Sequence, residues 1–229
     1  MTRPNRSKSN DGNGDGVSRG LALGAAAVVA SAGFAALTAA VARRRTAQAD
    51  HAVRKRAAAP KGRPARRAAE ALAPAGKWWT YIPGALASAI YLLKAQPPAR
   101  KGAMRSRRTG AGAVFLAGVA ATALNPTFDH LLPQPPPPPG HRSRRKPVFP
   151  SGHAFGPSAI SLATAYVLTR ERMARPRIAF PAALAVPAFT AVPRMMQEKH
   201  WASDVLGGLL AGVALAAACT AVYEAAREP

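Results

Sequence analysis

Four ionisable side chains lie at the edges of apolar segments in the second half of the chain. His153 ends the sequence Phe-Pro-Ser-Gly-His and is followed directly by an apolar run. Farther along, Arg194, His200 and Asp204 precede another apolar run. Ionisable groups at the edge of a membrane span are costly and usually functional. Two imidazoles, a carboxylate and a guanidinium therefore indicate a phosphate-handling site at a membrane surface.

The second of these groups can supply a nucleophile. His200 and Asp204 are four residues apart, so they share a face if this turn is helical. A carboxylate that accepts a hydrogen bond from one imidazole nitrogen fixes the tautomer and leaves the other nitrogen as nucleophile. Arg194 offers a planar fork of donors to phosphate oxygens. The alternative is a set of loop salt bridges without a catalytic role, formed by Arg194, Glu198, Lys199 and Asp204.

The first group can bind an anion. Ser151 is a favoured helix N-cap residue, and Gly152 allows the backbone to approach a ligand closely. Free N–H groups at the start of a helix bind phosphate well, and His153 would face that anion from the first turn. The alternative interpretation is a capped helix whose histidine lies at a membrane interface without a chemical role.

The composition indicates which elements position these residues. The formal net charge is +22, and the chain is 48% apolar but only 6% aromatic. The charges cluster between uncharged runs, which favours a membrane protein with basic loops over a basic nucleic-acid-binding domain. No aromatic residue interleaves with the charges of residues 43–77, as a nucleic-acid site would require. Cys219 lies inside the last apolar run, so we expect a free, buried thiol.

Six apolar runs are candidate membrane spans, and nothing reads as a strand. We therefore predict an all-α fold, a six-helix transmembrane bundle with the active site at the membrane–water interface. Gly207, Gly208 and Gly212 would let neighbouring helices approach closely. The six runs are residues 21–42, 78–93, 109–128, 153–169, 178–193 and 205–223.

The first run has a rival interpretation, and the segments around it are polar. Basic residues precede residues 21–42 and small residues end the run, as in a secretory signal peptide, but its length favours a retained helix. We expect residues 1–20 to form a disordered polar tail. Residues 43–77 carry eleven Lys or Arg, which predicts a solvated basic loop, partly helical at most, near anionic lipid headgroups.

The remaining segments complete the domain organisation. Residues 78–223 form the predicted transmembrane core, and residues 224–229 form a tail. Pro135 to Pro139 are unbroken and cannot continue a helix, so they predict a stiff extended connector rather than a ligand for an SH3-type domain.

The two sequences P-S-G-H and R-x5-H-x3-D, in this order and each opening a late membrane helix, resemble the type-2 phosphatidic acid phosphatase family. That family includes bacterial undecaprenyl pyrophosphate phosphatases and is related to vanadium haloperoxidases. The resemblance covers residues 78–223. It implies a nucleophile that becomes a phosphohistidine, its orienting carboxylate, an acid for the leaving oxygen and a phosphate cradle. In that order, the matching residues are His200, Asp204, His153, and the group Arg194, Ser151 and Gly152.

The resemblance also implies partners and location. It implies a lipid phosphate or prenyl diphosphate as substrate, no metal or other cofactor, and no nucleic-acid partner. It implies an integral protein of the plasma membrane whose site faces outward and whose termini lie in the cytoplasm. The basic loops 94–108 and 170–177 agree with that orientation, whereas residues 43–77 disagree because they would face outward.

One part of the family pattern is degenerate. The family has K-x6-R-P before P-S-G-H, but this region reads N-P-T-F-D-H-L-L-P-Q-P-P. Placing Thr127 or Asp129 at the lysine position puts Gln134 or Pro136 at the arginine position. An alternative function is therefore a catalytically weakened relative that binds a lipid phosphate or a partner protein. The same loop is crowded by basic residues at other spacings, namely Arg142, Arg144, Arg145 and Lys146.

Overall fold

Regular secondary structure is entirely helical in the part of the chain that the computed structural model describes, residues 11–58, 60, 62–95, 102–139, 141 and 148–227. This confirms the predicted all-α class. The elements are α1 (Asp11–Ala42), α2 (Ala47–Ala57), α3 (Pro64–Leu72), the 3-10 helix η1 (Ala73–Gly76), α4 (Trp78–Lys94), α5 (Ala103–Leu131), α6 (Gly152–Arg170), α7 (Pro176–Met196) and α8 (Ala202–Arg227).

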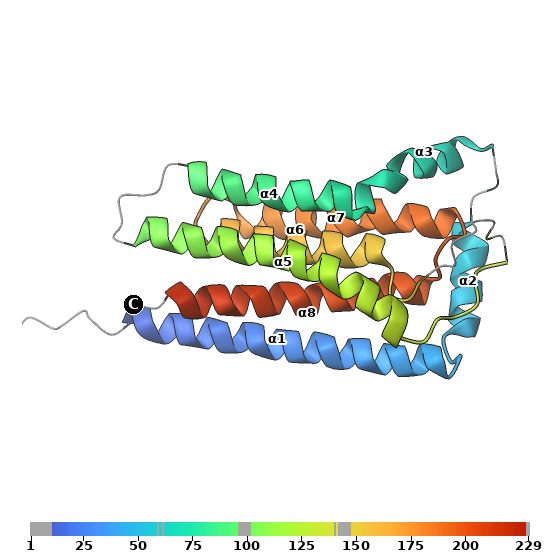
Figure 1. Cartoon of the computed structure of the whole chain (residues 1–229), viewed down its shortest axis with the longest axis horizontal. Helices are drawn as coiled ribbons and strands as arrows, with labels where there is room; N and C mark the ends of the chain where they lie inside the picture. The colour runs from blue at the N-terminus through green and yellow to red at the C-terminus, as the bar shows by residue number, and fades with distance from the viewer. Residues whose placement is uncertain are drawn as a thin grey trace, which may run out of the picture.

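Six long helices run side by side, and α2 crosses one end of them (Figure 1). Helix α1 packs along α8, α6 packs against α5, α7 and α8, and α4 pairs with α5. At the end that carries α2 and α3, helices α1, α5 and α7 finish and α4, α6 and α8 begin (Figure 1). We call this the site end. The opposite end, which carries the start of α1 and the last turn of α8, is called the closed end.

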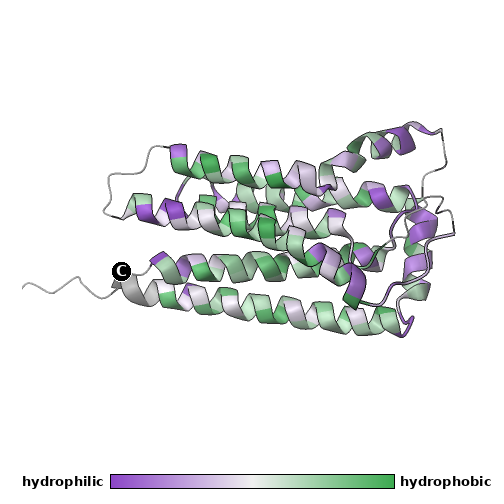
Figure 2. Ribbon diagram, viewed as in Figure 1, coloured by the Kyte–Doolittle hydropathy of each residue, from purple (hydrophilic) through white to green (hydrophobic). Residues whose placement is uncertain are grey.

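Each of the six apolar runs forms a helix, but among the described residues only four helices have both the length and the hydropathy of a membrane span. These are residues 16–42 of α1, together with α5, α7 and α8. Helices α4 and α6 do not meet those criteria, so the predicted count of six spans is not established. Apolar residues follow the long helices, while hydrophilic residues gather at the ends and on α2 and α3 (Figure 2). The protein is an integral membrane protein.

Helix α1 shows the character of a lipid-facing element. Only 11% of its most apolar window is buried, and Val28 and Val29 are 69% and 72% exposed. A soluble protein would rarely leave such an apolar surface uncovered. In a bilayer, the same surface is solvated by lipid tails.

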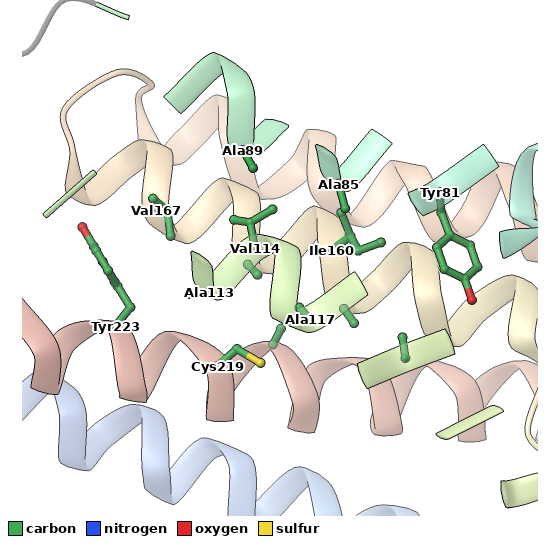
Figure 3. Close-up of a cluster of buried hydrophobic side chains, with 14 of the residues drawn as sticks. Tyr81, Ala85, Ala89, Ala113, Val114, Ala117, Ile160, Val167, Cys219 and Tyr223 are labelled. Carbon is green, nitrogen blue, oxygen red and sulfur yellow. The ribbon is translucent and has the colours of Figure 1, made fainter. Parts of the chain in front are cut away.

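Small residues allow the inner helices to pack closely. A Cβ added at Gly208 would lie 2.5 Å from the carbonyl oxygen of Ser151, and one at Gly212 would lie 2.5 Å from the Cβ of Ser158. The close approach that we predicted for these glycines, both of α8 against α6, is confirmed. Side chains of α4, α5, α6 and α8 meet in the core, and Cys219 is free and buried among them, as predicted (Figure 3).

Three predicted segments differ from the structure. Helix α1 begins at Asp11, so the second half of the predicted disordered tail is helical, and residues 1–10 lie outside the described residues. Residues 43–77 are largely exposed, as predicted, but they are more helical than predicted, since they contain α2, α3 and η1. Helix α8 continues to Arg227, so most of the predicted C-terminal tail is helical. Pro133 to Pro138 have no regular secondary structure, as an extended connector requires.

Candidate active site

A cavity of about 1020 Å³ opens at the site end and gathers the predicted residues. Gly152, His153, Arg194 and His200 line it. The other two predicted residues, Ser151 and Asp204, lie behind this lining and are 0% exposed. The structure therefore brings together all six residues that the two sequence motifs single out.

The end of α7 places Arg194 and His200 at the same cavity wall. The N–H of Lys199 donates to the carbonyl oxygen of Arg194 at 2.9 Å, and the N–H of Glu198 donates to that of Met195 at 2.9 Å. Glu198 has a φ of 53°. These two bonds around a left-handed residue are a Schellman helix end, which reverses the chain within a few residues. Because the reversal is so tight, the side chains on either side of it stay close.

His200 and Asp204 form the pair that their spacing predicts. The Nδ1 atom of His200 lies 3.4 Å from Oδ2 of Asp204, and the N–H of Trp201 donates to the same oxygen at 2.8 Å. The carboxylate thus faces Nδ1 and leaves Nε2 as the imidazole nitrogen that it does not engage. This arrangement is suited to a nucleophilic imidazole.

The turn before α6 is hydrogen-bonded directly to the first turn of α8, which follows His200. The N–H of Ser151 donates to the carbonyl oxygen of Asp204 at 2.8 Å. Ser151 occupies the N-cap position of α6 as predicted, but its hydroxyl makes no cap bond. A Cβ at Gly152 would lie 2.5 Å from the side-chain amide nitrogen of Asn125. Glycine is therefore required where α5 meets this turn.

His153 lies across the cavity from His200. The two imidazole ring centroids are 6.2 Å apart. The hydroxyl of Thr190 donates to the carbonyl oxygen of His153 at 2.6 Å, which ties α7 to the first turn of α6. One ring comes from the first turn of α6 and the other from the segment between α7 and α8.

Four buried polar atoms at this site have no hydrogen-bond partner among the described residues. They are Oγ of Ser151, Nε2 of His153, Nε of Arg194 and Oδ1 of Asp204. Buried polar groups in proteins are nearly always paired, so the unpaired atoms of Ser151, His153 and Arg194 indicate a polar ligand. The alternative of salt bridges within this loop is not observed among the described residues. Glu198 pairs with Arg54 at 2.7 Å, and Asp204 faces His200.

Helices α2 and α3 hydrogen-bond to the chain on either side of His200, at Met196 and Ser203. The buried carboxylate of Asp50 accepts hydrogen bonds from the N–H and the hydroxyl of Ser203, each at 2.8 Å. Arg66 donates to the carbonyl oxygen of Met196 at 2.8 Å. Sequence reasoning missed these contacts, because the bonded residues are 153 and 130 positions apart and no local pattern joins them.

Several further cavity residues were also missed. Lys77, Tyr81, Asn125 and Asp129 line the cavity from α4, α5 and the residue before α4. No local motif marks them. Lys199 also lines it, and the sequence did give a signal there, because this lysine stands between Arg194 and His200.

A second, apolar cavity of about 470 Å³ adjoins the first. It lies between α4, α6 and α7 and shares Tyr81 with the larger cavity. Its lining includes Gly84, Ala183 and Val186. Small side chains on three helices thus leave an apolar space that is separated from the polar cavity by Tyr81, the residue that lines both.

Comparison with known proteins identifies the family. The PAP2 superfamily model matches residues 109–228, more than half of the chain. The fold is similar to the crystal structure of the first transmembrane PAP2-type phosphatidylglycerolphosphate phosphatase from Bacillus subtilis, with a TM-score of 0.55 and 18% identity over 83% of this chain and 92% of that one. A search of curated proteins gave no match. The predicted family resemblance is confirmed, and the chain belongs to the PAP2 superfamily.

Proposed function

We propose that the protein is a membrane phosphatase that hydrolyses a lipid phosphate or prenyl diphosphate through a phosphohistidine. One observation carries the proposal. His200 has its Nδ1 against the buried Asp204 and faces His153 across 6.2 Å, beside buried polar groups that lack protein partners. A nucleophile, an acid and an anion cradle are the parts that such a reaction requires.

The reaction has two displacement steps. In the first, Nε2 of His200 bonds to phosphorus as the bond from phosphorus to the lipid oxygen breaks, and His153 gives its proton to that leaving oxygen. In the second, water attacks the phosphohistidine and passes a proton to His153. The phosphorus–nitrogen bond then breaks, and phosphate leaves. Asp204 holds the ring of His200 and stabilises its positive charge throughout.

Charge on the transferred phosphoryl group needs preorganised donors. Arg194 supplies a guanidinium, and the hydroxyl of Ser151 and the N–H groups of Gly152 and His153 point from the start of α6. Those two N–H groups have no backbone acceptor among the described residues. Donors fixed before the reaction stabilise the transition state without reorganisation.

The apolar cavity supports a lipid substrate rather than a soluble phosphate. It shares Tyr81 with the lining of the polar cavity, so an apolar space between α4, α6 and α7 lies next to the proposed headgroup site. Burying a lipid chain there adds roughly 0.8 kcal/mol for each methylene group. The exposed Trp78 and Trp79 at the start of α4 fit a membrane–water interface beside this entrance.

We also propose that the site faces outward across the plasma membrane. At the closed end, α4 ends at Lys94, α5 begins with Arg105 and Arg108 in its first two turns, and the α6–α7 connection carries Arg172 and Arg175, which favours a cytoplasmic closed end. The basic residues of α2 and α3 lie at the site end and oppose this orientation, although Arg54 and Arg66 are paired with Glu198 and Glu70. Cysteines introduced in residues 43–57 should react with an impermeant thiol reagent on intact cells.

A second function remains supported by the degenerate first motif. No lysine or arginine occurs between Asn125 and Gly140. A protein without these cations would bind lipid phosphate with little turnover. The distinction is experimental, since both functions use the same cavity.

The purified protein should be assayed for phosphate release from phosphatidate, phosphatidylglycerol phosphate and prenyl diphosphates, with His200→Ala beside the wild type. We expect turnover of at least one lipid and none in the variant. Orthovanadate binding without turnover of any of these lipids would favour the binding function, and equal turnover by the variant would refute the mechanism.

A further inference from the structure

The lysine and arginine of the family's first motif are absent from this chain, but other basic residues line the cavity. Where the family has its first lysine, α5 presents Asn125 and Asp129 to the cavity. Gln134 cannot replace the arginine, because its amide group is bonded to the backbone N–H and carbonyl oxygen of Phe149 at 2.8 and 3.1 Å. The cavity nevertheless contains two lysines, Lys77 and Lys199, that belong to neither part of the missing motif.

Lys77 is held at the cavity by its neighbours in sequence. Its Nζ lies 4.4 Å from the centroid of the Trp79 ring, a cation–π contact that restricts the side chain. The preceding residue, Gly76, packs so tightly that an added Cβ would lie 2.6 Å from the imidazole of His153. The backbone that carries Lys77 is therefore pressed against the site.

Lys199 is held by the helix end described above. Its N–H is bonded to the carbonyl oxygen of Arg194, and the next residue is His200. Partial burial lowers the pKa of its ammonium group, and the positive charge of Arg194 lowers it further. A cation held close to other cations gains from binding an anion between them.

Two carboxylates close to Lys199, those of Glu70 and of the adjacent Glu198, are each paired with an arginine. Glu70 pairs with Arg66 at 3.1 Å, and Glu198 pairs with Arg54 at 2.7 Å. Asp129 lines the cavity but forms no salt bridge with a described residue. Neither lysine has a salt bridge within the described part of the chain, so both ammonium groups are available to a ligand.

We propose that Lys77 and Lys199 bind the non-bridging oxygens of the substrate phosphate and so replace the missing basic pair. This inference rests on the proposed function, because it concerns the same site. One cation comes from the residue before α4 and the other from the turn between Arg194 and His200. The site would thus keep three cations around the phosphoryl group, with Arg194 as the third.

The test combines a binding assay with a rate assay on the purified full chain in detergent. Orthovanadate, a phosphate analogue, is titrated by calorimetry, and phosphatidate hydrolysis is followed by phosphate release. The variants are Lys77→Ala, Lys199→Ala, the double variant, and Lys→Arg at each position. Lys94→Ala is the matched control, since this lysine is exposed at the opposite end of α4.

A hydrogen bond to a charged group contributes about a factor of 10 to 100, so each alanine should weaken vanadate binding and lower kcat/KM by about 10-fold. The double variant should lose about 100-fold, arginine should restore most of it, and Lys94→Ala should change neither by more than about 2-fold. Unaltered thermal midpoints would show that the variants fold.

Other results separate this inference from the proposed function. If the wild type hydrolyses lipid and the double variant keeps its rate and vanadate affinity, the inference is overturned while the function stands. If vanadate binding depends on both lysines but no lipid is hydrolysed, the inference stands and the function falls. A larger loss on neutralising Arg142, Arg144, Arg145 and Lys146 together than on removing both lysines would also overturn it.

Discussion

Arginines at the two ends of the helix bundle differ in whether a carboxylate partners them. At the closed end, Arg170 makes two bonds to the buried Glu224 at 2.6 and 3.0 Å, and Arg227 lies 3.7 Å from the buried Glu171. At the site end, Nε of Arg194 is buried with no partner among the described residues.

This difference separates structural charge from functional charge. At the closed end, Glu171 and Glu224 accept hydrogen bonds from the hydroxyls of Tyr166 and Tyr223 and form ion pairs with arginines, which joins α5, α6 and α8. Nε of Arg107 makes no hydrogen bond among the described residues, but it lies 3.9 Å from the carboxylate of Glu171. At the site end, Arg54 and Arg66 are paired with carboxylates, whereas Nε of Arg194, Nε2 of His153 and Oγ of Ser151 have no partner among the described residues. An anion is what completes that second arrangement.

The largest effect is expected at the closed end, and it should be on stability. Glu224→Ala would leave Arg170 without its bidentate partner, and breaking a buried pair from one side costs about 3–5 kcal/mol. The thermal midpoint in detergent should fall markedly. Glu70→Ala, which breaks a pair whose carboxylate is 57% exposed, should cost no more than about 1 kcal/mol. Equal decreases in thermal midpoint for Glu224→Ala and Glu70→Ala would contradict the structural role assigned to the buried Glu224.

At the site end, the same kind of change should affect rate instead. Arg194→Ala should lower kcat/KM for the lipid phosphate by about 100- to 1000-fold, because it removes a charged donor from the developing phosphoryl charge. Its thermal midpoint should stay close to that of the wild type, since the guanidinium makes no salt bridge among the described residues. If Arg194→Ala kept the wild-type kcat/KM but lost much of its thermal stability, Arg194 would have the structural role that is assigned to the closed-end arginines.

The joint between the two motifs can be tested by overpacking. Gly208→Ala would bring a Cβ to 2.5 Å from the carbonyl oxygen of Ser151, at the turn that forms the cradle. Overpacking of this kind costs about 1–3 kcal/mol and should also reduce turnover. Gly112→Ala is the control, because a Cβ there meets no atom within 4 Å. Tolerance of both variants would show that the α6–α8 contact is looser than described.

The smallest effect is expected from the hydrogen bonds that join Asp50 of α2 to Ser203. Asp50→Asn keeps the shape of the side chain but removes the charge that accepts two bonds from Ser203, so we expect a loss of about 1–2 kcal/mol in stability. Asp50→Ala should cost somewhat more. If turnover falls much further than stability in both variants, α2 positions His200 as well as holding the fold.

The same contrast explains what could be predicted from the sequence. His200 and Asp204 are four residues apart and Ser151 opens a helix, so local spacing alone predicted their arrangement. The all-helical class followed from the length of the apolar runs. Residues 43–77 were misread because their charges indicate solvent, whereas Asp50 and Arg54 are committed to residues near position 200. The closed-end network was missed for the same reason, since it joins three helices.

The central claim is that His200 carries the phosphoryl group during turnover. Phosphatidate labelled in its phosphate should be mixed with the purified protein, quenched in alkali and analysed by proteolysis and mass spectrometry. We expect label on His200 in the wild type, as an acid-labile phosphohistidine, and neither label nor turnover in His200→Ala. Label on Ser151, or phosphate release by His200→Ala at the wild-type rate, would contradict the account.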